Sequence, residues 1–99
     1  MEIELHKQAE RELQEFSQEI RQELKSRLKE LEDSPAGHEN SDRIEVRGRP
    51  VFRYVTKENS RGGEIDHRAI YDIKDGKVMV YTVFHRDKGY QKNDIARRF

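Results

Sequence analysis

Apolar positions recur along this chain with two different periods, which separate a helical first half from an extended second half. At the N-terminus, Ile3 and Leu5 alternate with glutamates, which predicts a short edge strand. From Ala9 onward, apolar residues recur every three or four positions and predict an amphipathic helical segment. This stripe consists of Ala9, Leu13, Phe16, Ile20, Leu24, Leu28 and Leu31.

The stripe is too long for one helix in a domain of 99 residues, so we expect a helical hairpin. The break falls at residues 16–18, where the Ser17 hydroxyl is expected to cap the second helix. The dipeptide Ser34-Pro35 ends that helix, because the residue before a proline avoids the α conformation. Residues 34–49, with Pro35, Gly37, Asn40, Ser41 and Gly48, predict a loop.

The second half predicts an antiparallel meander of three strands, at residues 51–56, 65–73 and 78–86, with a connection at 57–64. Asp75-Gly76 stands between two apolar runs and predicts a type I′ hairpin turn.

Pairing through this turn fixes which side chains share a face of the sheet. It sets His67 opposite Phe84 on one face and Asp66 opposite His85 on the other. The first face is more apolar and should pack on the helices, which makes His67 a packing residue. The second face carries Arg68 and His85 and should point outward. The tyrosines of the strands (Tyr54, Tyr71 and Tyr81) are expected to pack in the sheet.

The last residues, 93–99, predict a short C-terminal helix with Asn93 or Asp94 as its cap. Ile95 and Phe99 would form its apolar side. Together these elements predict one α+β domain over residues 1–99.

The charge distribution refines this picture. Charged residues make up 40% of the chain and the net charge is zero, but the two halves differ. Residues 1–49 hold 9 Lys or Arg against 13 Asp or Glu, and residues 50–99 hold 11 against 7. This suggests an acidic helical half and a cationic face on the sheet, although charge balance alone favours a solvated surface with uneven charge.

Several classes of site are not supported by the sequence. There is no cysteine for a disulfide or thiolate site, and the four histidines lack metal-ligand spacing. We therefore expect neither a metal nor a small-molecule cofactor. No apolar run is long enough to span a membrane and the N-terminus has no signal-peptide core, so we expect a cytoplasmic protein.

Four segments carry a family resemblance, in this order: LEDSP, RGRPVFRY, HRAIYDI and HRDKGY. In this order and spacing they resemble the RelE/ParE toxin superfamily, over nearly the whole chain. The resemblance implies an N-terminal strand and a helical hairpin packed on an antiparallel sheet. It also implies a toxin that is neutralised by a cognate antitoxin protein.

In the ribonuclease branch of that superfamily, the toxin enters the ribosomal A site and cleaves mRNA. The resemblance places Arg68, Arg86 and Tyr90 at catalytic positions and Arg53 at the position of a substrate-binding lysine. A second family lysine falls at Val55 here, which leaves the general base open.

Two side chains are candidates for the general base, Lys57 and the titratable His85. Lys57 and Lys88 are further candidates for binding RNA.

These residue types suit metal-free RNA cleavage, in which the 2′-OH of the substrate is the nucleophile. Arginines donate forked hydrogen bonds to phosphate oxygens, and a tyrosine can stack on a base or bind the 2′-OH. Arg68 has a purely structural reading as well, because it could pair with Asp66 or Asp72.

Two other functions remain open at this point. One is a ParE-type toxin that binds DNA gyrase, and the other is a non-catalytic RNA- or protein-binding module on the same fold.

Overall fold

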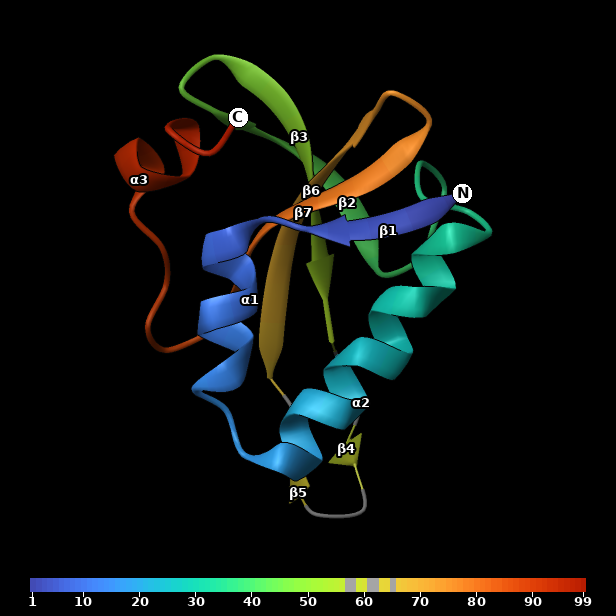
Figure 1. Ribbon diagram of the computed structural model, residues 1–99, viewed down its shortest axis with the longest axis vertical. Helices are drawn as coiled ribbons and strands as arrows, with labels where there is room; N and C mark the ends of the chain where they lie inside the picture. The colour runs from blue at the N-terminus through green and yellow to red at the C-terminus, as the bar shows by residue number, and fades with distance from the viewer. Residues whose placement is uncertain (57–58, 61–62, 65) are drawn as a thin grey trace.

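The computed structural model describes residues 1–56, 59–60, 63–64 and 66–99, and it shows the predicted α+β fold. A five-stranded sheet has the order β1-β7-β6-β3-β2, and two helices cover one of its faces (Figure 1). Within the described residues, no helix has the length and the run of apolar side chains that crossing a bilayer requires. The elements are β1 (Glu2–Leu5), α1 (Lys7–Gln14), α2 (Gln18–Lys29), β2 (Ser41–Val46), β3 (Arg49–Val55), β4 (Asn59–Ser60), β5 (Gly63–Glu64), β6 (His67–Lys74), β7 (Lys77–His85) and α3 (Lys92–Ala96).

The N-terminal part follows the prediction closely. Strand β1 lies at one edge of the sheet, parallel to β7. The helical hairpin breaks where expected, and the backbone N–H of Ile20 donates to Ser17 Oγ at 3.3 Å, which caps α2. Helix α2 ends at Lys29 and continues as a 3₁₀ turn to Glu32, before the Ser34-Pro35 dipeptide.

The predicted loop at residues 34–49 is wrong over its second half. Residues 41–46 form β2, which pairs antiparallel with β3 and makes the other edge of the sheet. Arg47 and Gly48 connect the two strands with φ values of 54° and 80°. Positive φ at both central residues is the mark of a type I′ turn, here with an arginine in a position that usually holds Asn, Asp or Gly.

The hairpin between β6 and β7 has the predicted type I′ turn, since φ is 53° at Asp75 and 74° at Gly76. The predicted register is correct from this turn as far as Tyr71, which pairs with Val80. Beyond Tyr71 it is wrong, because a bulge in β7 shifts the pairing by one residue and sets Ile70 opposite Thr82.

The bulge changes which side chains share a face. His67 now pairs with His85, and Arg68 pairs with Phe84. His85 therefore lies on the same face as His67, and the predicted placement of His85 beside Arg68 on the outward face is wrong. We call the face that carries His67 the helix face and the face that carries Arg68 the outer face.

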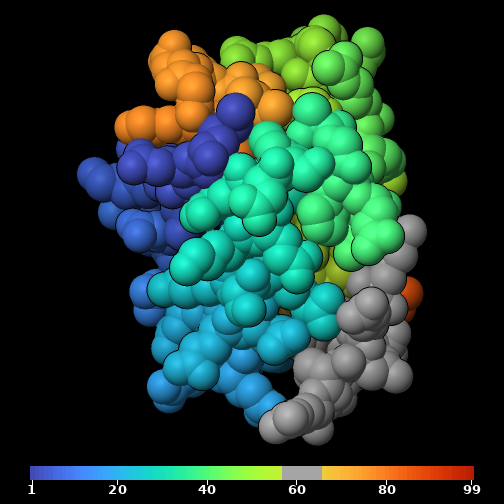
Figure 2. Space-filling model, turned by 90° about the vertical axis from the view of Figure 1, so that its right-hand side faces the viewer, coloured from blue at the N-terminus to red at the C-terminus, as the bar shows by residue number. Residues whose placement is uncertain are grey.

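The helix face holds the larger core. Figure 2, which views the molecule from the side of α2, shows α2 and the segment after it running along this side (cyan to green). Buried leucines of the hairpin pack here on buried residues of three strands. Burial of such side chains is the main favourable contribution to folding. The buried members are Ala9, Leu13, Leu24, Leu28, Leu31, Phe52, Tyr54, Ala69, Tyr71, Val78, Val80 and Val83.

The C-terminal segment covers part of the outer face. Ile95 of α3 is buried there and the Phe99 ring lies 4.8 Å from the Tyr81 ring, so the predicted apolar side is confirmed. The N-cap is Gln91, not Asn93 or Asp94, and it makes no side-chain cap bond. The prediction that the strand tyrosines pack in the sheet is also confirmed, because Tyr54, Tyr71 and Tyr81 are fully buried.

Candidate nucleic-acid interface

Two arginines meet on one carboxylate at the open end of the outer face. Arg68 Nη1 donates to Asp66 Oδ1 at 3.2 Å, and Arg86 Nη1 lies 2.9 Å from Asp66 Oδ2. The backbone N–H of Arg86 also donates to the carbonyl oxygen of Asp66 at 3.0 Å. Asp66 precedes β6 and Arg86 follows β7, so the antiparallel pairing of these strands brings the three residues together.

The side chains of this cluster differ in their access to solvent. Asp66 is 16% exposed and Arg68 is 22% exposed, whereas Arg86 is 60% exposed. The carboxylate is therefore largely enclosed by its two partners, and Arg86 projects toward solvent. Arg86 has a second carboxylate beside it, since its Nε lies 3.6 Å from Asp87 Oδ1. The cluster therefore holds two cations and two anions, and its suitability for a phosphate comes from the forked guanidinium donors rather than from net charge.

A row of paired residues crosses the sheet at the level of Arg68. Val55 of β3 pairs with Arg68, which in turn pairs with Phe84 of β7. Arg53 lies on the same face two residues before Val55, and it binds Asp42 of β2 through two hydrogen bonds, of 3.3 and 2.9 Å. The arginine cluster thus adjoins a second arginine–carboxylate pair.

A shallow pocket of about 300 Å³ opens between these groups. Its described lining includes Arg53, Val55 and Arg68 together with Asp42 and the residues 39–41. None of these described lining residues is a histidine or a lysine, and Val55 contributes only an aliphatic surface. The described part of the lining therefore offers arginine donors, with neither an imidazole nor an amine beside them.

Aromatic side chains lie on the other side of the cluster. The Tyr90 ring is half-buried against Phe84, with 5.0 Å between the ring centroids. Lys88 is exposed and lines a pocket of about 320 Å³ with Phe84 and Tyr90. Rings beside cations form the usual surface for single-stranded nucleic acid, whose bases stack while its phosphates bind the cations.

The two histidines of the strand ends point the other way. The ring of His67 is buried on the helix face, 4.7 Å from Phe16 and 5.0 Å from His85, so the prediction of a packing histidine is confirmed. Burial lowers the pKa of His67, and nearby His85 lowers it further, although Asp66 acts in the opposite direction. His67 is therefore neutral at physiological pH.

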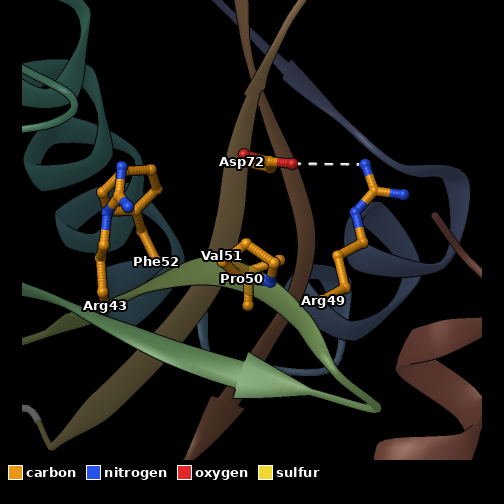
Figure 3. Close-up of a pocket in the computed structure, with 6 residues that line it drawn as sticks. All are labelled: Arg43, Arg49, Pro50, Val51, Phe52 and Asp72. Carbon is orange, nitrogen blue, oxygen red and sulfur yellow. Dashed lines mark hydrogen bonds and ion pairs between the residues drawn. The ribbon is translucent and has the colours of Figure 1, made fainter.

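A second pocket, of about 250 Å³, lies toward the β2–β3 turn and is drawn in Figure 3. There Arg49 Nη2 lies 3.3 Å from Asp72 Oδ2, and the Arg43 guanidinium stands 5.3 Å from the centre of the Phe52 ring. Asp72 is 19% exposed, so it matches Asp66 in burial and type of partner, but it lies within β6 and holds one arginine instead of two.

The structure thus brings Arg53, Arg68, Arg86 and Tyr90 to one face and leaves His85 on the other. Lys57 lies outside the described residues. Sequence reasoning named Asp66 as a possible partner of Arg68, but it missed that Asp66 binds Arg86 too. The sequence signal for this contact was that Asp66 and Arg86 lie at nearly equal distances before and after the Asp75-Gly76 turn. The bulge shifts the pairing by one residue, so the register counted from the turn did not set them side by side. Across the described chain, no three His, Asp or Glu side chains gather as metal ligands do.

The sequence profile of a family described as the ParE toxin of type II toxin-antitoxin systems matches residues 3–90. The chain belongs to this family. It is accordingly a toxin of a type II toxin-antitoxin system, in the RelE/ParE superfamily that the sequence motifs resemble. A search of curated protein sequences found no match.

Two solved structures resemble this toxin. One is a double arginine-to-alanine mutant of the E. coli toxin RelE in the free state, with a TM-score of 0.69 and 23% identity, covering 99% of this chain and 96% of that chain. The other is the intact E. coli RelBE toxin–antitoxin complex, with a TM-score of 0.60 and 26% identity, covering 85% of this chain and 94% of that chain. The first shows a shared fold.

Proposed function

We propose that this toxin is an endoribonuclease that cleaves mRNA on the ribosome, without a metal ion, and thereby inhibits translation. The observation that carries the proposal is the pair of arginines, Arg68 and Arg86, held on one carboxylate at the edge of an aromatic surface. Fixed arginine donors are what a crowded, negatively charged phosphorane needs for its stabilisation.

In the proposed reaction the 2′-oxygen of a nucleotide attacks the adjacent phosphorus, and the bond from phosphorus to the 5′-oxygen breaks. The products are a 2′,3′-cyclic phosphate and a 5′-hydroxyl end. Arg68 stabilises the non-bridging oxygens as their charge grows, and the exposed Arg86 supports the leaving 5′-oxygen, which takes its proton from water. Each guanidinium has five N–H groups. Asp66 engages only Nη1 of each, and Asp87 lies near Nε of Arg86 at 3.6 Å, so donors on both arginines remain for the phosphate.

Tyr90 positions the nucleotide. Its ring already packs on Phe84, the strand partner of Arg68, so a base stacked on Tyr90 would place its phosphate near the arginines. Arg53 and Lys88, which lie on either side, bind flanking phosphates as cations. Lys57 belongs to the same proposal as a further phosphate contact.

Removal of the proton from the 2′-OH is the step for which the described residues supply the fewest candidate groups. Val55 stands where the family has a lysine, and the helix-face position of His85 gives it no role in this proposal. We therefore assign the proton to solvent hydroxide or to a group of the ribosome, which also positions the mRNA.

A cognate antitoxin is the second partner in this proposal, as in the RelBE complex whose structure this toxin resembles. Two surfaces suit an extended or helical antitoxin segment, namely the helical hairpin and the unpaired edges of β1 and β2. Co-expression of the antitoxin should restore growth to cells that produce the toxin.

The alternative function is binding of DNA gyrase, as a ParE-type toxin. Two observations favour it: the family profile that matches is that of ParE, and Val55 replaces the lysine. In this case the arginine cluster would bind a protein surface and no RNA would be cut.

One experiment separates the two functions. Purified toxin is added to a cell-free translation reaction, the message is mapped by primer extension, and the same preparation is assayed for inhibition of gyrase supercoiling. The proposal expects new mRNA ends only where ribosomes translate, and normal supercoiling. Intact mRNA together with inhibited gyrase would establish the alternative.

A further inference from the structure

Among the described residues, Asp66 is the one that forms an ion pair with both arginines of the cluster. We propose that its carboxylate is a positioning residue, which holds Arg68 and Arg86 in the geometry that the scissile phosphate requires. The inference rests on the proposed endoribonuclease function. It assigns a role to an acidic group in a site whose chemistry otherwise uses cations.

The first argument is geometric. Each oxygen of the carboxylate faces a different arginine, at 3.2 Å for Arg68 and 2.9 Å for Arg86. The main chain of Asp66 adds a third contact, because its carbonyl accepts from the backbone N–H of Arg86. The backbone hydrogen bond fixes the position of the Arg86 main chain. The contact between the two side chains fixes the direction in which the long arginine side chain extends.

The second argument is electrostatic. Two guanidinium groups that converge on one phosphate repel each other while the site is empty. A carboxylate between them offsets this repulsion and lets both side chains stay close together before RNA binds. Because Asp66 is only 16% exposed, water screens this attraction less than it would at the surface.

The third argument concerns the conformational entropy of the Arg86 side chain. Arg86 is 60% exposed, and a long exposed arginine samples many rotamers that must be lost when the substrate binds. The contact with Asp66 removes much of this freedom in advance. Donors that are already oriented need no reorganisation as charge develops in the transition state.

This role predicts a particular pattern of kinetic effects. Replacing Asp66 with asparagine removes a negative charge, so attraction of RNA should be unchanged or stronger. The rate of cleavage in the bound complex should nevertheless fall, because the arginines are no longer held in place. A carboxylate that served only to repel RNA or to stabilise the fold would not produce this division between binding and rate.

The test is single-turnover cleavage of ribosome-bound mRNA over a range of toxin concentrations. We expect Asp66→Asn to lower the saturating rate on the order of tenfold to a hundredfold, while the half-saturating concentration does not rise. Asp66→Glu retains the charge but moves the oxygens by one methylene, and its saturating rate should fall as well. Asp72→Asn is the matched control, since it removes a similarly buried β6 carboxylate that pairs with Arg49, and it should cleave as the wild type does.

Circular dichroism verifies that each variant is folded. If Asp66→Asn does not fold, the saturating rate of Asp66→Glu tests the inference by itself. Wild-type rates in the folded Asp66 variants, with active wild type, would overturn this inference and leave the proposed function standing. An equal loss in Asp72→Asn would overturn it too, by showing a general effect of charge. A wild-type toxin that leaves mRNA intact would overturn both.

Discussion

Arg68 and Arg86 pair with opposite oxygens of the same carboxylate, that of Asp66, although one lies in β6 and the other beyond the end of β7. The contact joins the two ends of a hairpin and points both guanidinium groups at one region of the surface. The ion pair between Arg68 and Asp66 would also be expected if Arg68 had only a structural role. The position of Arg86, which is mostly exposed, favours the functional reading, because an exposed ion pair adds little stability.

The first prediction concerns these two arginines. Arg68→Ala and Arg86→Ala should each slow cleavage of ribosome-bound mRNA by about a hundredfold or more, which corresponds to about 3 kcal/mol of transition-state stabilisation. Both variants should stay folded, because neither side chain belongs to a buried core. Arg49→Ala is the control, since it removes the arginine that pairs with Asp72, a similarly buried carboxylate, and should cleave normally. Wild-type rates in both cluster variants would remove these residues from the mechanism.

The second prediction separates the ring of Tyr90 from its hydroxyl. Tyr90→Ala removes the stacking surface beside Phe84 and should reduce single-turnover cleavage by about tenfold to a hundredfold, the usual value of a base–aromatic stack. Tyr90→Phe keeps the ring and should lose much less. Equal losses in the two variants would show that the hydroxyl, and not the ring, is what the substrate needs.

Several elements of the fold could be predicted from the sequence alone. Periodicity and turn residues were sufficient for the helical hairpin, the Ser17 cap and the Asp75-Gly76 turn, because each depends on local interactions. Strand β2 was missed although Ile44 and Val46 alternate with charged residues, since Gly and Asn nearby favoured a loop and an arginine at positive φ is uncommon in a turn.

The position of His85 could not be predicted for a different reason. The bulge in β7 follows no glycine or proline, and it arises where both Tyr81 and Ile70 are buried under the C-terminal segment. Such a shift depends on tertiary packing, and it reverses the face of every later residue in the strand. The candidate site was therefore predictable in its arginines and tyrosine, but not in its histidine or in the double role of Asp66.

The third prediction concerns what holds the C-terminal segment in place. Glu12 Oε1 accepts from Thr82 Oγ1 at 2.8 Å, from the backbone N–H of Val83 at 3.3 Å and from Arg98 Nη1 at 3.0 Å. Glu12→Ala removes this shared acceptor, although Arg98 Nη1 keeps its bond to the carbonyl of Tyr81 at 2.8 Å. The substitution should lower the free energy of unfolding by about 1–3 kcal/mol. Chemical denaturation measures this value, with Glu10→Ala, an exposed position on the same helix, as the control. A loss no larger than that of the control would contradict this account.

The fourth prediction is a dependence of stability on pH. Burial holds the pKa of His67 in the folded state below its ordinary value of 6.5, so the unfolded chain binds a proton that the folded protein resists. The free energy of unfolding should therefore decrease as the pH falls below about 6.5, toward the lower folded-state pKa. Denaturation of wild type and His67→Gln at several pH values between neutrality and about pH 5 checks this, and the variant should show a weaker dependence. An unchanged dependence in the variant would assign the effect to other groups.

The account depends most on whether this toxin cuts RNA by transesterification, and the ends of the RNA fragments test that directly. Messenger RNA bound to ribosomes is incubated with wild-type toxin and with Arg68→Ala, and the termini of the fragments are analysed chemically. We predict 2′,3′-cyclic phosphate and 5′-hydroxyl ends with the wild type, and rates reduced by about a hundredfold or more with the variant. Intact mRNA with the wild type, or equal amounts of the same fragments with the variant, would contradict the account.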